Sequence, residues 1–253
     1  MIEAYYQDDY CTIYHGDCRD ILPHLDPVDL VLTDPPWLAS KNLRRTEIKG
    51  GVGKYYKNGS GIRYGDVGEF EQSLIHDAIG TGNRAAVFTG LKEIRNFDWK
   101  WIAFWHRGNP MPTPILPYNQ SVSPILMFGN WQGVSIGDQL LSINILSAGC
   151  IASPERVLEH KNGPAAHPCQ MPVSLPTLFI NATDATTVLD PWVGSGTTLV
   201  AAKDLQRQAI GIEIEEKYCE IAAERLASFE PLPFLPVEPA PAPAECLELF
   251  TDD

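Results

Sequence analysis

One short segment of the 253-residue chain combines three groups that could act on an aromatic amine: Asp34, Pro35-Pro36 and Trp37. The exocyclic amine of a nucleobase is a poor nucleophile because its lone pair is delocalised into the ring. A carboxylate and a rigidly directed carbonyl, both accepting hydrogen bonds from the amine, would localise that lone pair, and proline directs the carbonyl by locking φ. The face of Trp37 could stack on an extruded base. Taken alone, the segment also fits a turn that ends a strand, because Pro-Pro stops both ladder and helix.

A glycine-rich segment, 189–198, could cradle a ligand. Its two glycines, Gly194 and Gly196, permit a tight turn and let a ligand approach the backbone closely. Glu213 follows 17 residues after Gly196, at the end of the next apolar run. In nucleotide-binding folds an acid placed there accepts hydrogen bonds from ribose hydroxyls.

The charges beside this loop favour a cationic ligand over a phosphate. No Lys follows the second glycine as a P-loop requires, and Asp190 would repel phosphate. The same carboxylate suits an α-amine or a sulfonium group. A helix could start at Thr197 or Thr198, so that loop, helix and acid together favour an adenosine-containing cation.

The elements that must position these groups alternate short apolar runs with helical patterns. The expected strands are 28–33, 85–89, 101–105, 124–128, 186–189 and 208–212. Continuous apolar strands with helices between them predict an α/β fold with a mostly parallel sheet, covered on both faces. The clearest helix carries Tyr218, Ile221, Ala222 and Leu226 on one face, and Glu215 and Glu216 near its positive end.

Composition narrows the class of protein. With 44% hydrophobic residues, the chain can form one sizeable core, and it has no apolar run long enough to span a membrane. The six cysteines show no C-x-x-C spacing, so neither a metal site nor a disulfide framework is expected, and a cytoplasmic location is the simpler reading. The net charge of −13 argues against non-specific coating of nucleic acid.

The charge is unevenly distributed. Residues 41–63 contain four Lys and three Arg but only one acid, Glu47. Residues 230–253 contain six acids and no base. A basic loop on an acidic body could bind one strip of phosphates, and a solvated surface loop fits equally well.

Four segments together resemble the β class of amino-methylating DNA methyltransferases, the N6-adenine/N4-cytosine type with a permuted motif order. In chain order the matching segments are Gly16-Asp17-Cys18, Thr33-Asp34-Pro35-Pro36-Trp37, His167-Pro168-Cys169-Gln170-Met171-Pro172 and Asp190-Pro191-Trp192-Val193-Gly194-Ser195-Gly196-Thr197-Thr198. The catalytic D-P-P-[YFW] segment precedes the cofactor segment, as in that class. The resemblance implies a Rossmann-like S-adenosylmethionine-dependent methyltransferase fold.

The resemblance also implies roles for the matching residues. The catalytic set is Asp34, Pro35, Pro36 and Trp37. The cofactor set, for S-adenosylmethionine, is Asp17, Cys18, His167, Gln170, Pro172, Asp190, Pro191, Trp192, Gly194, Ser195, Gly196, Thr197, Thr198 and Glu213. The expected contacts to double-stranded DNA come from the loop after the catalytic motif, through Lys41, Arg44, Arg45, Lys49 and Lys54. A homodimer is possible, and a prokaryotic or phage source is expected.

Three positions depart from the family pattern. Trp37 stands in place of the commoner Tyr, which keeps stacking but removes a phenol hydroxyl. Trp192 replaces the usual Phe. Met171 replaces the usual Lys, which removes a charge near the cofactor entrance and bears on cofactor affinity.

Other functions remain open at this stage. N4 of cytosine is the second candidate target, and Asp34 tilts the choice to N6 of adenine because N4 enzymes usually carry Ser there. Pro168-Cys169-Gln170 resembles the nucleophile segment of cytosine-C5 enzymes, but it precedes the cofactor loop instead of following it. A catalytically idle nucleic-acid-binding protein is the alternative of another class. Methylation of RNA or protein is a further one, although a glutamine-methylating enzyme would carry N-P-P-Y.

The expected organisation is a methyltransferase catalytic domain over residues 1–230 and a Pro-rich acidic tail over 231–253. Within the domain, 38–65 is the basic DNA-contacting loop and about 130–166 is a short recognition region. This interval leaves little room for a separate recognition domain.

Overall fold

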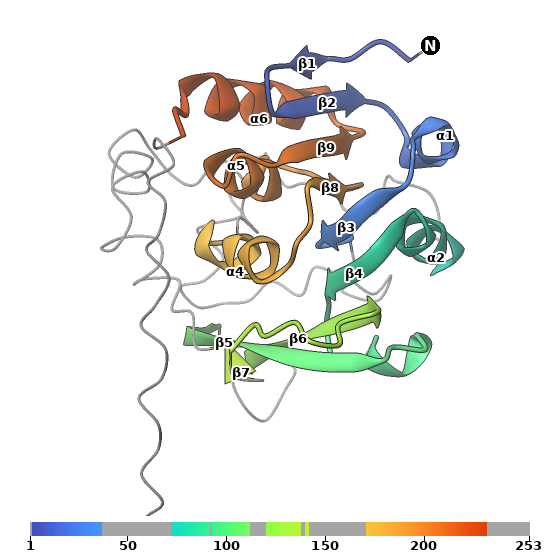
Figure 1. Cartoon of the computed structure of the whole chain (residues 1–253), viewed down its shortest axis with the longest axis vertical. Helices are drawn as coiled ribbons and strands as arrows, with labels where there is room; N and C mark the ends of the chain where they lie inside the picture. The colour runs from blue at the N-terminus through green and yellow to red at the C-terminus, as the bar shows by residue number, and fades with distance from the viewer. Residues whose placement is uncertain are drawn as a thin grey trace, which may run out of the picture.

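The computed structural model describes residues 2–36, 72–91, 93–111, 120–137, 140–141 and 171–231. Its strands form one nine-stranded sheet in the order β1-β2-β9-β8-β3-β4-β6-β5-β7 (Figure 1). The strands are β1 (Tyr6–Gln7), β2 (Cys11–His15), β3 (Val28–Thr33), β4 (Gly82–Phe88), β5 (Trp101–Met111), β6 (Gln120–Gly129), β7 (Leu140–Leu141), β8 (Thr187–Asp190) and β9 (Gln208–Glu213).

The helices pack on both faces of this sheet. They are α1 (Cys18–Ile21), η1 (Leu22–His24), α2 (Gln72–Gly80), η3 (Ile94–Asn96), α4 (Ser174–Ala182), α5 (Thr197–Asp204) and α6 (Glu216–Ser228). In Figure 1, α4, α5 and α6 lie together along one face, while α1 and α2 lie toward the other. None of the helices in the described ranges has the length and apolar character that a membrane crossing requires.

The sheet is mostly parallel, which confirms the predicted fold class. Five neighbouring strands, β2, β9, β8, β3 and β4, pair in parallel. The strand β6 then runs antiparallel between β4 and β5, and β1 is antiparallel to β2 at the other edge. All six expected strands are present, with β5 and β6 longer than the apolar runs indicated.

The chain order explains how distant motifs meet. The last two strands, β8 and β9, insert between β2 and β3. Val31 therefore lies beside Leu189, although the two belong to opposite ends of the chain. In open α/β sheets, ligands bind at the carboxyl ends of strands where the connections diverge. Here that point lies between β8 and β3.

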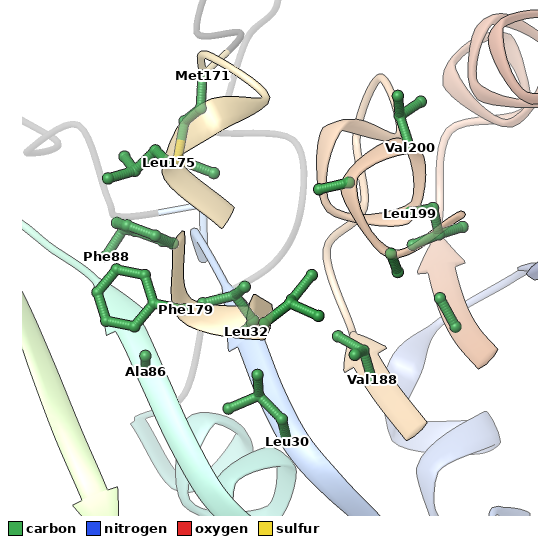
Figure 2. Packing of buried hydrophobic residues seen from close by; sticks show 14 of the residues in the cluster. Leu30, Leu32, Ala86, Phe88, Met171, Leu175, Phe179, Val188, Leu199 and Val200 are labelled. Atoms are coloured by element: carbon green, nitrogen blue, oxygen red, sulfur yellow. The ribbon is translucent and has the colours of Figure 1, made fainter. Parts of the chain in front are cut away.

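Two apolar clusters, one on each face, hold the central strands rigid. Along β3, Leu30 and Leu32 belong to the cluster with α4, α5 and α6, whereas Val31 belongs to the cluster with α1 and α2. Figure 2 shows Leu32 packed near Phe179 of α4. Strands buried on both faces need apolar residues at consecutive positions, which is why they appear as continuous runs in the sequence.

The last helix follows the expected pattern closely. Tyr218, Ala222 and Leu226 are buried as predicted, while Ile221 is only half-buried and Cys219 takes a core position. Glu215 occupies the N-cap. Helix α6 thus packs its apolar face over β2 and β9, next to α5.

Candidate active site

Three neighbouring parallel strands end in the groups that the sequence singled out. The strand β9 ends at Glu213, β8 at Asp190, and β3 at Thr33, directly before Asp34. Because the strands run in the same direction, these ends lie at one edge of the sheet. Asp34 is half-buried and Pro35 is buried. The fold therefore brings the Asp-Pro-Pro segment and the glycine loop to adjacent strand ends.

A direct hydrogen bond joins the two motifs. The hydroxyl of Thr33 donates to Oδ1 of Asp190 at 2.6 Å, and both side chains are buried, at 0% and 3% exposure. The same oxygen accepts from the backbone N–H of Trp192 at 3.2 Å. The residue before Asp34 is thus tied to Asp190, which directly precedes the glycine loop.

Burial shifts the protonation of Asp190. Removal from water raises the pKa of this carboxyl to about 6, and the neighbouring hydroxyls of Thr33 and Thr198 act in the opposite direction. A cationic ligand placed beside Asp190 would favour the ionised form. Binding of a positively charged group at Asp190 stays a prediction from the sequence.

The glycine loop has the backbone shape that only glycine adopts easily. Gly194 and Gly196 have φ of +50° and +83°, and Gly196 is the N-cap of α5. A Cβ at Gly196 would lie 3.0 Å from Cβ of Ala222, so α6 packs directly on this glycine. A Cβ at Gly194 would meet nothing within 4 Å. The side of the loop at Gly194 is therefore open to a ligand.

Glu213 holds the other end of the loop. Its Oε2 accepts from the N–H of Gly194 at 2.9 Å, and its Oε1 accepts from the N–H of Glu215 at 2.9 Å. Burial raises the pKa of this carboxyl. A carboxylate offers about four lone-pair sites, so Glu213 keeps acceptor capacity for a ligand hydroxyl. Glu213 can thus brace the loop and bind a ribose at the same time.

Two residues near the loop were not among the predicted site residues. Ile214 follows Glu213 and is 42% exposed, so it offers an apolar surface at the sheet edge. Arg225 of α6 donates from Nη1 to the carbonyl oxygen of Ser195 and, at 3.2 Å, to its hydroxyl. An Arg on an amphipathic helix looks like a solvated residue in sequence, so no local signal identifies it.

The Gly-Asp-Cys segment has a structural role that the sequence did not predict. Asp17 is the N-cap of α1, and its carboxylate accepts hydrogen bonds from the backbone N–H and guanidinium of Arg19. Hydrogen bonding by Arg19 lowers the pKa of Asp17. The side chain of Cys18 is buried in the cluster on the α1 face, and its carbonyl accepts from the N–H of Leu22. Cofactor contacts from these two residues stay predictions.

The other predicted residues divide by whether the structure describes them. Pro172 is buried just before α4, and its carbonyl accepts from the N–H of Leu175. Pro191 is buried and Trp192 half-buried, both next to Asp190. Outside the described residues lie Trp37, His167, Gln170, Lys41, Arg44, Arg45, Lys49, Lys54 and most of the expected recognition region. In the described ranges, no three His, Cys, Asp or Glu side chains are grouped to hold a metal ion.

Comparison with known proteins places this geometry in a wider context. A family model described as a DNA methylase of the N6/N4 methyltransferase kind matches residues 28–224. The type II methyltransferase M.HinfI of Haemophilus influenzae is 27% identical over 92% of this chain and 73% of its own length. M2.DpnII of Streptococcus pneumoniae, also a type II methyltransferase, is 23% identical over 89% of this chain and 93% of its own length.

Solved structures share the fold. The structure of M1.HpyAVI in complex with SAM superposes with a TM-score of 0.57 at 24% identity, over 85% of this chain and 99% of that one. PvuII DNA methyltransferase, described as cytosine-N4-specific, superposes with a TM-score of 0.60 at 19% identity, over 88% of each chain. The Rossmann-like methyltransferase fold expected from the motifs is confirmed by these likenesses.

Proposed function

Because the chain belongs to the N6/N4 DNA methylase family, we propose that it transfers a methyl group from S-adenosylmethionine to N6 of an adenine in double-stranded DNA. Methylation of an exocyclic base amine, on adenine or cytosine, is the activity of the family. The observation that carries the proposal is the position of Asp34, which follows β3 one strand from the glycine loop. A base held at Asp34 and a cofactor held at the loop would meet at this sheet edge.

The residues present fit S-adenosylmethionine. The open side of Gly194 leaves room for the ligand against the loop backbone. Glu213 has acceptor capacity for ribose hydroxyls, and the exposed Ile214 beside it offers an apolar face for the adenine ring. Asp190 supplies a buried carboxylate for a cationic group. When bound, this cofactor supplies an electrophilic methyl group on a sulfonium.

The contribution of Asp34 is to hold and polarise the target amine. Its carboxylate and the carbonyl of Pro35 accept the two amine hydrogens, so that the nitrogen lone pair points out of the conjugated ring. Pro36 keeps the carbonyl of Pro35 fixed because its ring locks its own φ and restricts the backbone of the residue before it. Asp34 also accepts the proton that the amine releases, directly or through water. Much of the acceleration comes from positioning the two reactants near attack distance.

Contact with DNA is assigned to residues outside the described ranges. The target base must leave the duplex to reach the carboxyl ends of the strands, and Trp37 is the proposed stacking partner of the flipped base. The basic loop at 38–65, with Lys41, Arg44 and Arg45, supplies phosphate contacts. A cytoplasmic location fits an enzyme that acts on bacterial DNA. The assignment of 1–230 as one catalytic domain belongs to the same proposal.

Cytosine N4 is the second candidate target, since a structure with the same fold is described as cytosine-N4-specific. The fold is therefore compatible with both bases. The choice of adenine rests on Asp34 at the first position of the D-P-P motif, where N4 enzymes usually carry Ser.

The decisive experiment identifies the modified nucleoside. Purified protein is incubated with mixed-sequence duplex DNA and methyl-labelled S-adenosylmethionine, and the digested DNA is analysed by mass spectrometry. The Asp34→Ala variant runs beside Asp26→Ala, a control that removes an exposed carboxylate outside the site. We expect N6-methyladenine from the wild type and the control, and none from Asp34→Ala.

Other outcomes have distinct meanings. N4-methylcytosine that depends on Asp34 would overturn the choice of base and keep the mechanism. Cofactor binding without any modified nucleoside would shift the assignment to an idle nucleic-acid-binding protein, or to RNA or protein as substrate.

A further inference from the structure

One face of α6 rests on the glycine loop. Ala222 and Arg225 are three residues apart, and side chains at this spacing lie on the same side of a helix. The Cα and Cβ of Ala222 lie against Gly196, close enough that an added Cβ would be 3.0 Å away. Arg225 extends over the same loop one turn later.

The guanidinium of Arg225 joins three oxygens of the loop. Its Nη1 donates to the carbonyl of Ser195, to the hydroxyl of Ser195 at 3.2 Å and to the hydroxyl of Thr197 at 3.4 Å. Ser195 and Thr197 are 4% and 5% exposed. The cation is thus directed at buried groups of the loop.

These contacts hold one peptide plane at both ends. The carbonyl of the Ser195–Gly196 peptide accepts from Arg225, and its N–H donates to the carbonyl of Val193 at 2.9 Å. Gly196 is the residue that tolerates either sign of φ, so this peptide could rotate without a steric penalty at Cα. With its carbonyl bonded to Arg225, the peptide keeps the orientation in which Gly196 has φ of +83° and starts α5.

We propose that Arg225 is a positioning residue for the cofactor: it selects the loop conformation that receives S-adenosylmethionine. The proposal rests on the proposed function for the identity of the ligand. Arg225 acts through Ser195 and Gly196 and makes no contact with the reacting atoms. Its loss should therefore weaken binding of the cofactor and leave the chemical step at saturation nearly unchanged.

The test compares cofactor binding in two variants of Arg225. Charge-assisted hydrogen bonds are the stronger class, so Arg225→Gln should raise the Kd for S-adenosylhomocysteine, measured by titration calorimetry, about tenfold. Arg225→Lys keeps the charge and a donor and should recover most of the affinity. In steady-state assays the KM for S-adenosylmethionine should rise with Kd, while kcat stays within about twofold.

A second readout needs neither ligand nor activity. Amide hydrogen exchange in the ligand-free protein should be faster in 193–198 of Arg225→Gln than of the wild type, with β3 and β8 unaffected. The matched control is Arg84→Gln. Arg84 makes the same kind of contacts elsewhere, to the carbonyl of Asn130 and the carboxylate of Asp184, both at 2.6 Å. This variant should lose stability without a change in Kd.

The outcomes separate this inference from the proposed function. If the wild type binds S-adenosylhomocysteine and Arg225→Gln binds it equally well, the inference is wrong and the function stands. An equal loss of affinity in Arg84→Gln would also overturn it, because the effect would then be general destabilisation. A wild type that binds neither S-adenosylhomocysteine nor S-adenosylmethionine would overturn both.

Discussion

The hydroxyl of Thr33 lies 2.6 Å from Oδ1 of Asp190, across two parallel strands whose residues are 157 positions apart in the chain. This bond connects β3, the strand that precedes Asp34, with β8, the strand that leads into the glycine loop. Any movement of one strand end relative to the other must stretch it. Thr33 therefore maintains the spacing between Asp34 and the glycine loop.

Replacing Thr33 with Val should test this connection. Val has the same shape but removes the hydrogen bond from residue 33 to the buried carboxyl of Asp190, which costs about 1–3 kcal/mol of unfolding free energy. Urea unfolding at pH 7 measures the loss, and turnover should fall with it. Thr33→Ser keeps the hydroxyl and should retain most of the stability. A loss in Thr33→Ser with none in Thr33→Val would show that packing of the methyl group, and not the hydrogen bond, is what matters.

Binding of S-adenosylmethionine should depend on pH through Asp190. The pKa of this carboxyl is raised to about 6 from an ordinary value of 3.8. Below pH 6, binding of a cationic ligand must therefore displace the proton from Asp190. Affinity should rise from pH 5 to pH 7 and then level off, with proton release detectable by calorimetry in buffers of different ionisation enthalpy. Asp190→Asn should bind more weakly and lose this slope. A slope that survives in Asp190→Asn would assign it to another group.

The raised pKa of Asp190 also predicts how stability depends on pH. Whereas affinity rises with pH, the unfolding free energy of the ligand-free protein should fall. The folded protein takes up a proton at Asp190 near pH 6, whereas the unfolded chain does so only near pH 3.8. The contribution of Asp190 to the unfolding free energy is therefore fully present below pH 3.8 and is lost as the pH rises through 6. Ligand-free wild type compared with Asp190→Asn, over pH 4 to 7, isolates this contribution.

Replacing each of the two loop glycines with Ala should have a different effect. Gly196→Ala places a methyl group against Ala222 and forces Ala to φ of +83°, so it should lose at least about 1–2 kcal/mol of stability. Gly194→Ala meets open space, so its stability cost should be limited to backbone strain, but the methyl enters the proposed cofactor space. Thermal unfolding and titration with S-adenosylhomocysteine separate the two effects. The reverse order of effects would place the cofactor on the other side of the loop.

Asp29 should have a purely structural role. It lies at the amino end of β3, opposite the strand ends that form the candidate site. Its Oδ2 accepts from the N–H and hydroxyl of both Thr186 and Thr187, at 2.7 to 3.0 Å, and these bonds lower its pKa to about 2. A lowered pKa gives stability above pH 3.8 that is lost as the pH falls toward 2. Asp29→Asn should lose about 1 kcal/mol at pH 7, since solvent screens this partly exposed group. Its affinity for S-adenosylhomocysteine should match the wild type.

The sequence by itself determined the family, the fold class and the central strands. The reasons are local: strands covered on both faces need continuous apolar runs, and a loop with φ above zero needs glycine, as at Gly194 and Gly196. The order of the Asp-Pro-Pro and glycine segments was also readable directly. Short or polar elements such as β1, β2 and α2 were not predicted, because their stability comes from neighbours and not from their own pattern.

Only the tertiary structure decided which groups touch. The insertion of β8 and β9 between β2 and β3 is what brings Thr33 to Asp190. The packing of α6 on the loop is what turns Arg225 inward. Such contacts depend on strand order and helix docking, which long-range burial of apolar surface selects. No local pattern specifies them, because each partner alone would be equally well satisfied by water.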